Sequence, residues 1–249
     1  MPVFSPEVLL ASAVVGFLIG AIGIGGILLI PALAAFAQLS PHQASATALF
    51  TFLFTGVLGT LLFQRKGSID WRQAATVCAG AIVFSYVGAR ASALVSGPVL
   101  MLVIALLIAF AGAYVFFPAK PRAPGEGEGR RTGLLLAIGA ASGFGSGFSG
   151  AGGPLFSVPL MVIGGFPALT AIGTSQVLQV WSAGAGSLAH LAAGTIQWPL
   201  VPVIVGGELG GVVAGVWLAH RVSALFLRRL AGAACLVVGA WLLVKHWPA

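Results

Sequence analysis

Two clusters of glycines stand at equivalent places in the two halves of this chain and could build a binding site from backbone alone. The clusters are Gly23-Ile24-Gly25-Gly26 and Gly150-Ala151-Gly152-Gly153, and each interrupts a long apolar run. A helix that follows such a break begins with unpaired N–H groups and the positive end of its dipole, which favour an anion. The alternative interpretation is that these glycines only permit helices to pack closely. We predict a small-anion site at Gly23, Gly25, Gly26, Gly150, Gly152 and Gly153.

Hydroxyl and amide side chains follow each glycine cluster, at the start of the next apolar run. They could donate hydrogen bonds to the same anion, and hydrogen bonding between helices is the alternative, which is favoured for Thr51 and is equally plausible for the others. The further predicted substrate-binding residues are Thr47, Thr174, Ser175, Gln176 and Gln179.

Two charged residues within apolar runs are candidates for a proton-coupling or charge-relay role. Glu208 is the only carboxylate in the middle of a run, and an acid at that depth is costly and indicates function. We interpret it as a proton-coupling carboxylate or the partner of a buried arginine, with a structural role as the alternative. Arg90 could attract an anion or pair with Glu208, although a cation that extends to the membrane surface is the favoured interpretation.

The composition places these residues in a lipid bilayer. Of the 249 residues, 59% are hydrophobic and 7% charged, which is too few charges to cover a soluble domain. The net charge of +7 comes from cations in the short gaps between apolar runs, whereas a nucleic-acid-binding protein gathers them on one face. We therefore expect no nucleic-acid partner.

No pattern in the sequence indicates an enzyme, a cofactor or a metal site. Gly145–Gly150 matches G-x-G-x-x-G formally, but it has neither the strand context nor the following acid of a dinucleotide site. There is no Walker A motif and no HExxH motif. Cys78 and Cys235 lie in apolar runs and are interpreted as packing residues.

The apolar runs predict an all-α integral membrane protein made of two repeats. Most runs are about 20 residues, the length that crosses a bilayer as a helix. When the second half is shifted by 127 positions, glycines, threonines and tryptophans coincide with those of the first half, as Thr47 does with Thr174. We predict a first repeat at 1–118, a linker at 119–132 and a second repeat at 133–249, as in many secondary transporters.

The loop charges predict that the repeats are inverted. If each glycine-broken run is a helical hairpin, followed by three transmembrane helices, ten of the twelve cations fall on one side of the membrane. Only Arg90 and Lys245 lie opposite. The excess of Lys and Arg marks the cytoplasmic side. We expect a multi-pass protein of the plasma (inner) membrane, with both termini outside and the linker in the cytoplasm.

The duplicated motif resembles the TauE/SafE family of sulfite-exporter-like membrane transporters. The motif is G-x-x-G-x-G-G, followed by Pro31 or Pro159 and then by Ala46–Ala48 or Gly173–Ser175. The resemblance covers nearly the whole chain apart from the linker. It implies secondary transport of sulfite, sulfoacetate or other organosulfonates, with the glycine turns and the threonine motifs as substrate-lining positions. The sequence departs from the family's pattern at two positions. Ile27 stands where the family often has a third glycine, and Ala48 stands where the second half has Ser175, so the resemblance implies a less polar site in the first half.

We therefore predict a carrier that moves a small anion by alternating access, with protons as one candidate for the coupling ion. The sequence leaves two other classes open. One is an anion channel with a filter made of the glycine turns, and the other is a structural membrane subunit that transports nothing. The exact substrate, the direction of transport, the coupling ion and assembly as a homodimer are also left open.

Overall fold

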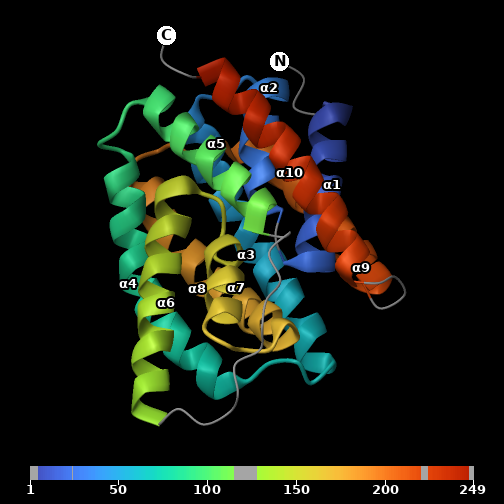
Figure 1. Ribbon diagram of the computed structural model, residues 1–249. Helices are drawn as coiled ribbons and strands as arrows, with labels where there is room; N and C mark the ends of the chain where they lie inside the picture. The colour runs from blue at the N-terminus through green and yellow to red at the C-terminus, as the bar shows by residue number, and fades with distance from the viewer. Residues whose placement is uncertain (1–4, 24, 115–127, 220–223, 247–249) are drawn as a thin grey trace.

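A computed structural model describes residues 5–23, 25–114, 128–219 and 224–246 (Figure 1). Within these ranges the regular elements are helices, and no strand occurs. The helices are α1 (Pro6–Ile22), η1 (Gly26–Leu28), α2 (Leu29–Phe36), α3 (Pro41–Arg65), α4 (Trp71–Ser92), α5 (Gly97–Tyr114), α6 (Glu128–Ser149), α7 (Pro154–Ile163), α8 (Ala168–Ala192), η2 (Trp198–Leu200), α9 (Val201–Ala219) and α10 (Ala224–His246).

Local signals in the sequence explain where several helices begin. Ser40 caps α3 with a capping box, in which its hydroxyl accepts from the N–H of Gln43 and the Gln43 side chain accepts from the N–H of Ser40. Asp70 caps α4 by accepting from the N–H groups of Arg72 and Gln73, at 3.1 Å each. Ser5 caps α1 in the same way.

Four helices of the described part are long and apolar enough to cross a membrane. They are Pro41–Arg65, Trp71–Ser92, Thr132–Ser149 and Trp198–Leu218. Helix α6 begins at Glu128, inside the range 119–132 that we predict as the linker, and residues 119–127 lie outside the described ranges. The three charged residues at 128–131 thus belong to the first turn of a helix.

Each glycine cluster joins a long helix to a short one. The turn at Gly23–Gly25 joins α1 to η1 and α2, and the turn at Gly150–Gly153 joins α6 to α7. Gly26–Phe36 and Pro154–Ile163 span about 15 Å at 1.5 Å per residue, which is about half of a bilayer's hydrocarbon thickness. The second limb of each hairpin is therefore too short to cross the bilayer.

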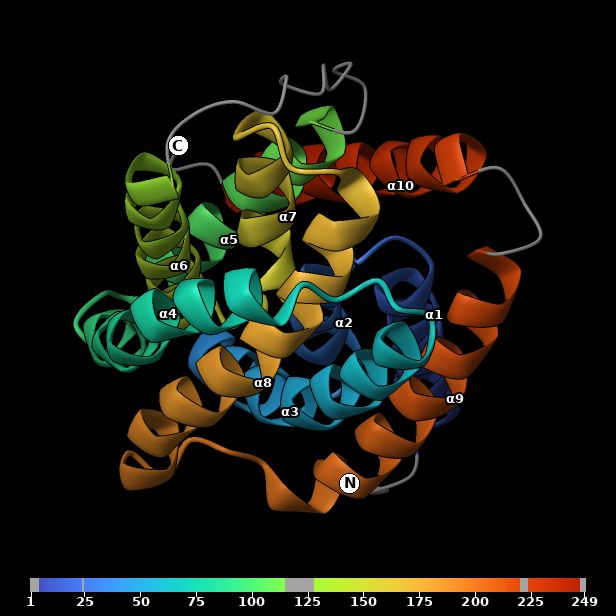
Figure 2. The same cartoon turned by 90° about the horizontal axis from the view of Figure 1, so that it is seen from below.

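Long helix pairs connect the two halves of the chain. Helix α1 packs along α9, and α4 packs along α6, on opposite sides of the molecule (Figures 1 and 2). Helices α3 and α8 also pack against each other, as do α5 and α10. The first helix of each half thus lies on the fourth helix of the other half.

The contacts in these pairs are reciprocal at the offset of 127 residues. Gly16 of α1 lies against the backbone of Glu208 in α9, and Gly143 of α6 lies against the backbone of Ala81 in α4. Gly143 and Glu208 lie 127 positions after Gly16 and Ala81, so the two contacts are equivalent in the two repeats. Two further equivalent contacts are Gly88 with Phe144 and Gly215 with Phe17. Close helix packing therefore explains these glycines, as it does in G-x-x-x-G pairs.

The packing role of the glycines predicts a large difference between two neighbouring residues of α9. A Cβ atom at Gly211 would lie on the carbonyl of Ala13 and 2.6 Å from the nitrogen of Phe17, whereas Gly210 has nothing within 4 Å. We expect Gly211→Ala to lower the free energy of unfolding by about 1–3 kcal/mol, through overpacking. Gly210→Ala should leave it unchanged or raise it, because alanine favours helix. Unfolding of the two variants in detergent measures the difference, and equal stabilities would contradict the packing role.

Candidate functional site

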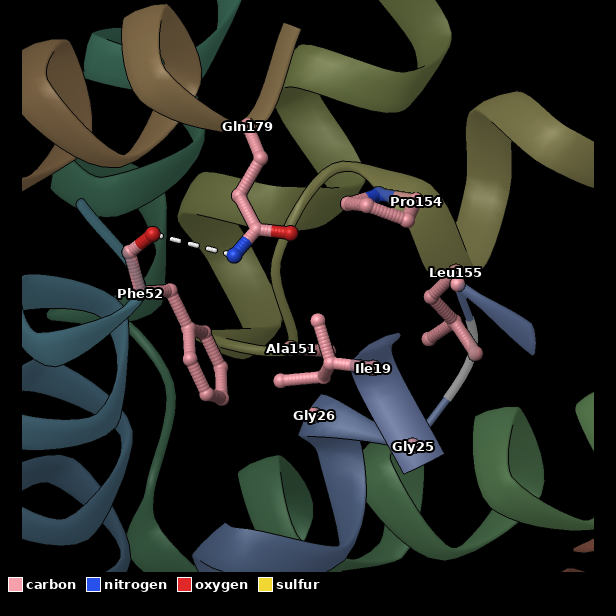
Figure 3. Close-up of a pocket in the computed structure, with 9 residues that line it drawn as sticks. Ile19, Gly25, Gly26, Phe52, Ala151, Pro154, Leu155 and Gln179 are labelled. Carbon is pink, nitrogen blue, oxygen red and sulfur yellow. Dashed lines mark hydrogen bonds between the residues drawn. The ribbon is translucent and has the colours of Figure 1, made fainter. Parts of the chain in front are cut away.

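The two glycine turns meet at one small buried cavity between the halves of the chain (Figure 3). It has room for about one water molecule. Residues from both turns, from α1 and from the crossing helices α3 and α8 line it. They are Ile19, Gly23, Gly25, Gly26, Phe52, Ala151, Pro154, Leu155 and Gln179.

The first turn needs glycine for both its backbone shape and its neighbours. Gly23 has φ 72° and ends α1 in the left-handed conformation, which side chains disfavour. At Gly26 a Cβ atom would lie 2.9 Å from Cζ of Phe52 and 3.1 Å from the carbonyl oxygen of Ala151. The backbone of the first turn can therefore approach the second turn only because Gly26 has no side chain.

The second turn also begins with a left-handed glycine, but it faces the cavity with different residues. Gly150 and Gly152 have φ values of 73° and 80°. Gly150 packs against Ser45 of α3, and the Ser45 hydroxyl donates to the Ser149 carbonyl at 2.9 Å. Gly152 faces the ring of Phe52, since a Cβ atom at this glycine would lie 3.2 Å from Cδ2 of the ring. The cavity itself is lined by Ala151 and by Pro154, the first residue of α7.

The ring of Phe52 lies between the two turns, a position that we did not predict from the sequence. This residue is buried in α3 and contacts Gly26 of one turn and Gly152 of the other. Its equivalent at the 127-residue offset is Gln179, so the repeat alignment contained a signal that pointed to it. The lining of the site therefore contains an aromatic ring and, next to it, an amide.

Gln179 of α8 is the predicted polar side chain that does reach the cavity. Its Nε2 donates to the carbonyl of Phe52 at 3.0 Å and to Oγ1 of Thr55 at 2.8 Å. Figure 3 shows the amide nitrogen directed at Phe52 and the amide oxygen on the other side of the group. These bonds hold α8 against α3 at the point where the two helices cross.

The other predicted polar residues are buried outside the cavity lining. Thr47 Oγ1 accepts from the N–H of Gln197 at 3.0 Å, and Ser175 Oγ accepts from the hydroxyl of Ser157 at 2.7 Å. The Thr174 hydroxyl and both side-chain polar atoms of Gln176 have no hydrogen-bond partner among the described residues. The structure thus connects Thr47 and Ser175 to neighbouring segments rather than to the space between the turns.

Glu208 is fully buried in α9 and is separated from Arg90. Neither carboxyl oxygen of Glu208 has a hydrogen-bond partner among the described residues. The Thr51 hydroxyl approaches the carboxyl but donates to the Ala48 carbonyl at 2.9 Å. Arg90 is exposed on α4 and lines a different cavity, so the two charged residues do not form the ion pair that the sequence left open.

Comparisons with known proteins identify the family. Residues 8–242 match the family model described as "Sulfite exporter TauE/SafE". A "Probable membrane transporter protein" of Xylella fastidiosa is 28% identical, over 95% of this chain and 94% of the relative. The "Probable membrane transporter protein YfcA" of Escherichia coli is 28% identical over 93% and 89%, and the "Probable membrane transporter protein YunE" of Bacillus subtilis is 26% identical over 82% and 85%. No solved structure matches the chain. With a family match over nearly its whole length and apolar helices of spanning length, the chain belongs to the TauE/SafE family of membrane transporters.

Proposed function

We propose that this protein is a secondary transporter that carries a small anion, such as sulfite, sulfoacetate or another organosulfonate, by alternating access. The observation that carries the proposal is the meeting of both glycine turns at one buried cavity. A compact anion held there would face backbone N–H groups at the starts of two short helices, although Pro154, the first residue of α7, has none. Backbone donors of this kind suit the oxygens of a sulfite or sulfonate group.

The small size of the cavity supports a carrier rather than a channel. A space for about one water molecule cannot hold a sulfonate, so the Phe52 ring or the turns must move before an anion enters. Such a movement is part of an alternating-access cycle, in which one half rocks against the other around the site. A channel filter would instead form a continuous path through the protein while it conducts.

Reciprocal contacts support the inverted arrangement that we propose for the two repeats. Equivalent contacts at a constant offset are expected when two similar halves are related by a two-fold axis. In Figure 1, α1 begins and α10 ends at one end of the molecule, and α6 begins at the other. With the positive-inside rule, this arrangement favours both termini outside the plasma membrane and the linker in the cytoplasm.

The anion site can be tested by two glycines that share a backbone shape but not a position. Gly152 (φ 80°) faces the Phe52 ring, and Gly194 (φ 65°) has nothing within 4 Å. Sulfite or methanesulfonate at about 100 times its Kd should stabilise the wild-type protein by about 2.7 kcal/mol. Gly152→Leu should lose the part of this stabilisation that comes from the site between the turns, and Gly194→Leu should retain all of it, in thermal unfolding with and without the anion.

Both variants place leucine at a left-handed position, so backbone strain is matched between them. Unfolding without anion shows that each variant is folded. If folded Gly152→Leu is stabilised by anions as strongly as the wild type, the site between the turns is refuted.

For Glu208 we propose the role of a proton-coupling carboxylate. A buried carboxylate without partners is far more costly than a neutral carboxyl group, so loss of its proton must accompany a change in its surroundings. Glu208→Gln keeps the size and the neutral form, and we expect it to fold normally. Anion flux into proteoliposomes should lose its dependence on a proton gradient. Glu7→Gln, an exposed control on α1, should keep that dependence, and a gradient-dependent Glu208→Gln would argue against the role.

Membrane orientation can be tested with single cysteines in a variant without Cys78 and Cys235. A cysteine at position 122 in the linker and one at position 222 should both react with an impermeant thiol reagent only from the cytoplasmic side. A cysteine at Leu94, which is 87% exposed, should react only from the outside. Labelling of positions 122 and 222 from opposite sides would contradict the inverted repeats.

A further inference from the structure

A second, larger cavity lies where α4 and α8 end and α3 begins. Its volume is about 500 Å³, within the range of small-molecule sites. In Figure 1 the end of α4 points towards the end of the molecule where α1 begins, opposite the start of α6. Polar residues in its lining are His42, Arg90, Ser92, His190 and Thr195, and no carboxylate is among the described residues that line it. The cavity is therefore positively charged and has the size of a small organic anion.

The three basic side chains hold different positions in this cavity. Arg90 is exposed and supplies a permanent charge. The Nε2 atom of His42 lies 3.1 Å and 3.2 Å from the carbonyl oxygens of Ser92 and Val95, so its N–H joins the start of α3 to the end of α4. The Nε2 atom of His42 is therefore engaged with the backbone, and the basic side chains that could contact a bound anion are those of Arg90 and His190.

His190 contributes to the cavity lining a polar atom that has no hydrogen-bond partner among the described residues. The residue is only 5% exposed, and its Nε2 has no hydrogen-bond partner among the described residues. Its Nδ1 lies 3.5 Å from the hydroxyl of Thr195, and the backbone of Gly147 in α6 lies beside the ring. The Thr195 hydroxyl also donates to the His190 carbonyl at 3.2 Å, so either ring nitrogen can carry the proton. In the tautomer with the proton on Nε2, the ring presents a buried donor that a ligand or water must satisfy.

A line of buried polar residues on α8 connects this cavity to the one between the turns. Gln179, Ser182 and His190 supply its polar side chains, and Gly186 lies between the last two; the spacings of three and four residues place all four on one face of the helix. The line covers about 16 Å at 1.5 Å per residue. It runs from His190 in the larger cavity to Gln179 in the central one.

Hydroxyl groups from two other helices converge on the middle of this line. Ser85 of α4 donates to the carbonyl of Ser182 at 2.6 Å, and Ser146 of α6 lies 3.4 Å from the Ser182 hydroxyl. The Ser182 hydroxyl lies 3.4 Å from the carbonyl of Gln179. All three serines are fully buried. Polar groups at this depth are costly, and they mark a route for a polar substrate better than they serve packing.

We propose that the cavity at Arg90 and His190 is a second anion-binding site, a vestibule that captures a sulfonate or a similar oxyanion before it moves along α8 to the glycine turns. The guanidinium group of Arg90 can bind two oxygens of such an anion at once, and the Nε2–H of His190 can donate to a third. The inference rests on the proposed function, because it assigns a place on the substrate's path. It also concerns different residues from those of the central site.

The experiment separates the two sites by using Gly152→Leu as the background. Calorimetric titration with methanesulfonate should show two sites in the wild type and one in Gly152→Leu. Adding Arg90→Gln to that background should weaken the remaining binding by about tenfold or more, the effect of losing a charge-assisted contact. Arg65→Gln, which removes an exposed cation at the far end of α3, should change the affinity by less than about twofold.

His190→Leu provides a second test, and it should also weaken vestibule binding because leucine has no polar atom to replace Nε2. Unchanged affinity in Gly152→Leu/Arg90→Gln, or an equal loss in Gly152→Leu/Arg65→Gln, would overturn the vestibule. If Gly152→Leu still binds methanesulfonate at two sites, the central site is refuted. If Arg90→Gln then weakens binding at one of these sites, the vestibule is still supported. Failure of the two proposals is therefore distinguishable.

Discussion

The close approach of helix backbones at glycines is the contact on which the rest of the structure depends. Where α1 meets α9 and α4 meets α6, a Cβ atom on the facing glycines would overlap the backbone of the partner helix. In a bilayer the lipid is as apolar as the side chains, so helices associate mainly through such tight packing. These two seams join the first half of the chain to the second at both sides of the molecule.

With the seams in place, the short helices α2 and α7 are enclosed between the halves. Their turns meet near the crossing of α3 and α8, where Phe52 and Gln179 occupy equivalent positions of the two repeats. Both turns begin with a left-handed glycine, Gly23 or Gly150, whereas the side chains from α3 and α8 are an aromatic ring and an amide. Both halves of the chain can therefore offer backbone N–H groups to an anion in this site, while the polar side chain in the cavity lining, Gln179, comes from the second half.

Much of this fold could be predicted from the sequence, because its signals are local. Glycine clusters, run lengths and the offset of 127 predicted the broken hairpins and the order of helices. The contact of Thr47 with Gln197 could not be predicted, because it depends on how α3 is rotated about its axis. Thr47, Thr51 and Thr55 recur at every fourth residue, but the sequence does not show what this polar row meets. For Phe52 the signal was its equivalence with Gln179 at the 127-residue offset. The separation of Arg90 from Glu208 likewise depends on which helices of the two halves become neighbours.

The central claim, that both glycine turns hold one small anion, is tested most directly by locating a heavy anion in crystals of the protein. Selenite is a close analogue of sulfite, and its selenium can be located by anomalous scattering. We expect a selenium peak between Gly26, Ala151 and Gln179, with the Phe52 ring displaced from its place between the turns. Selenium bound elsewhere in the protein, with no peak between the turns in crystals that bind the anion, would contradict the claim.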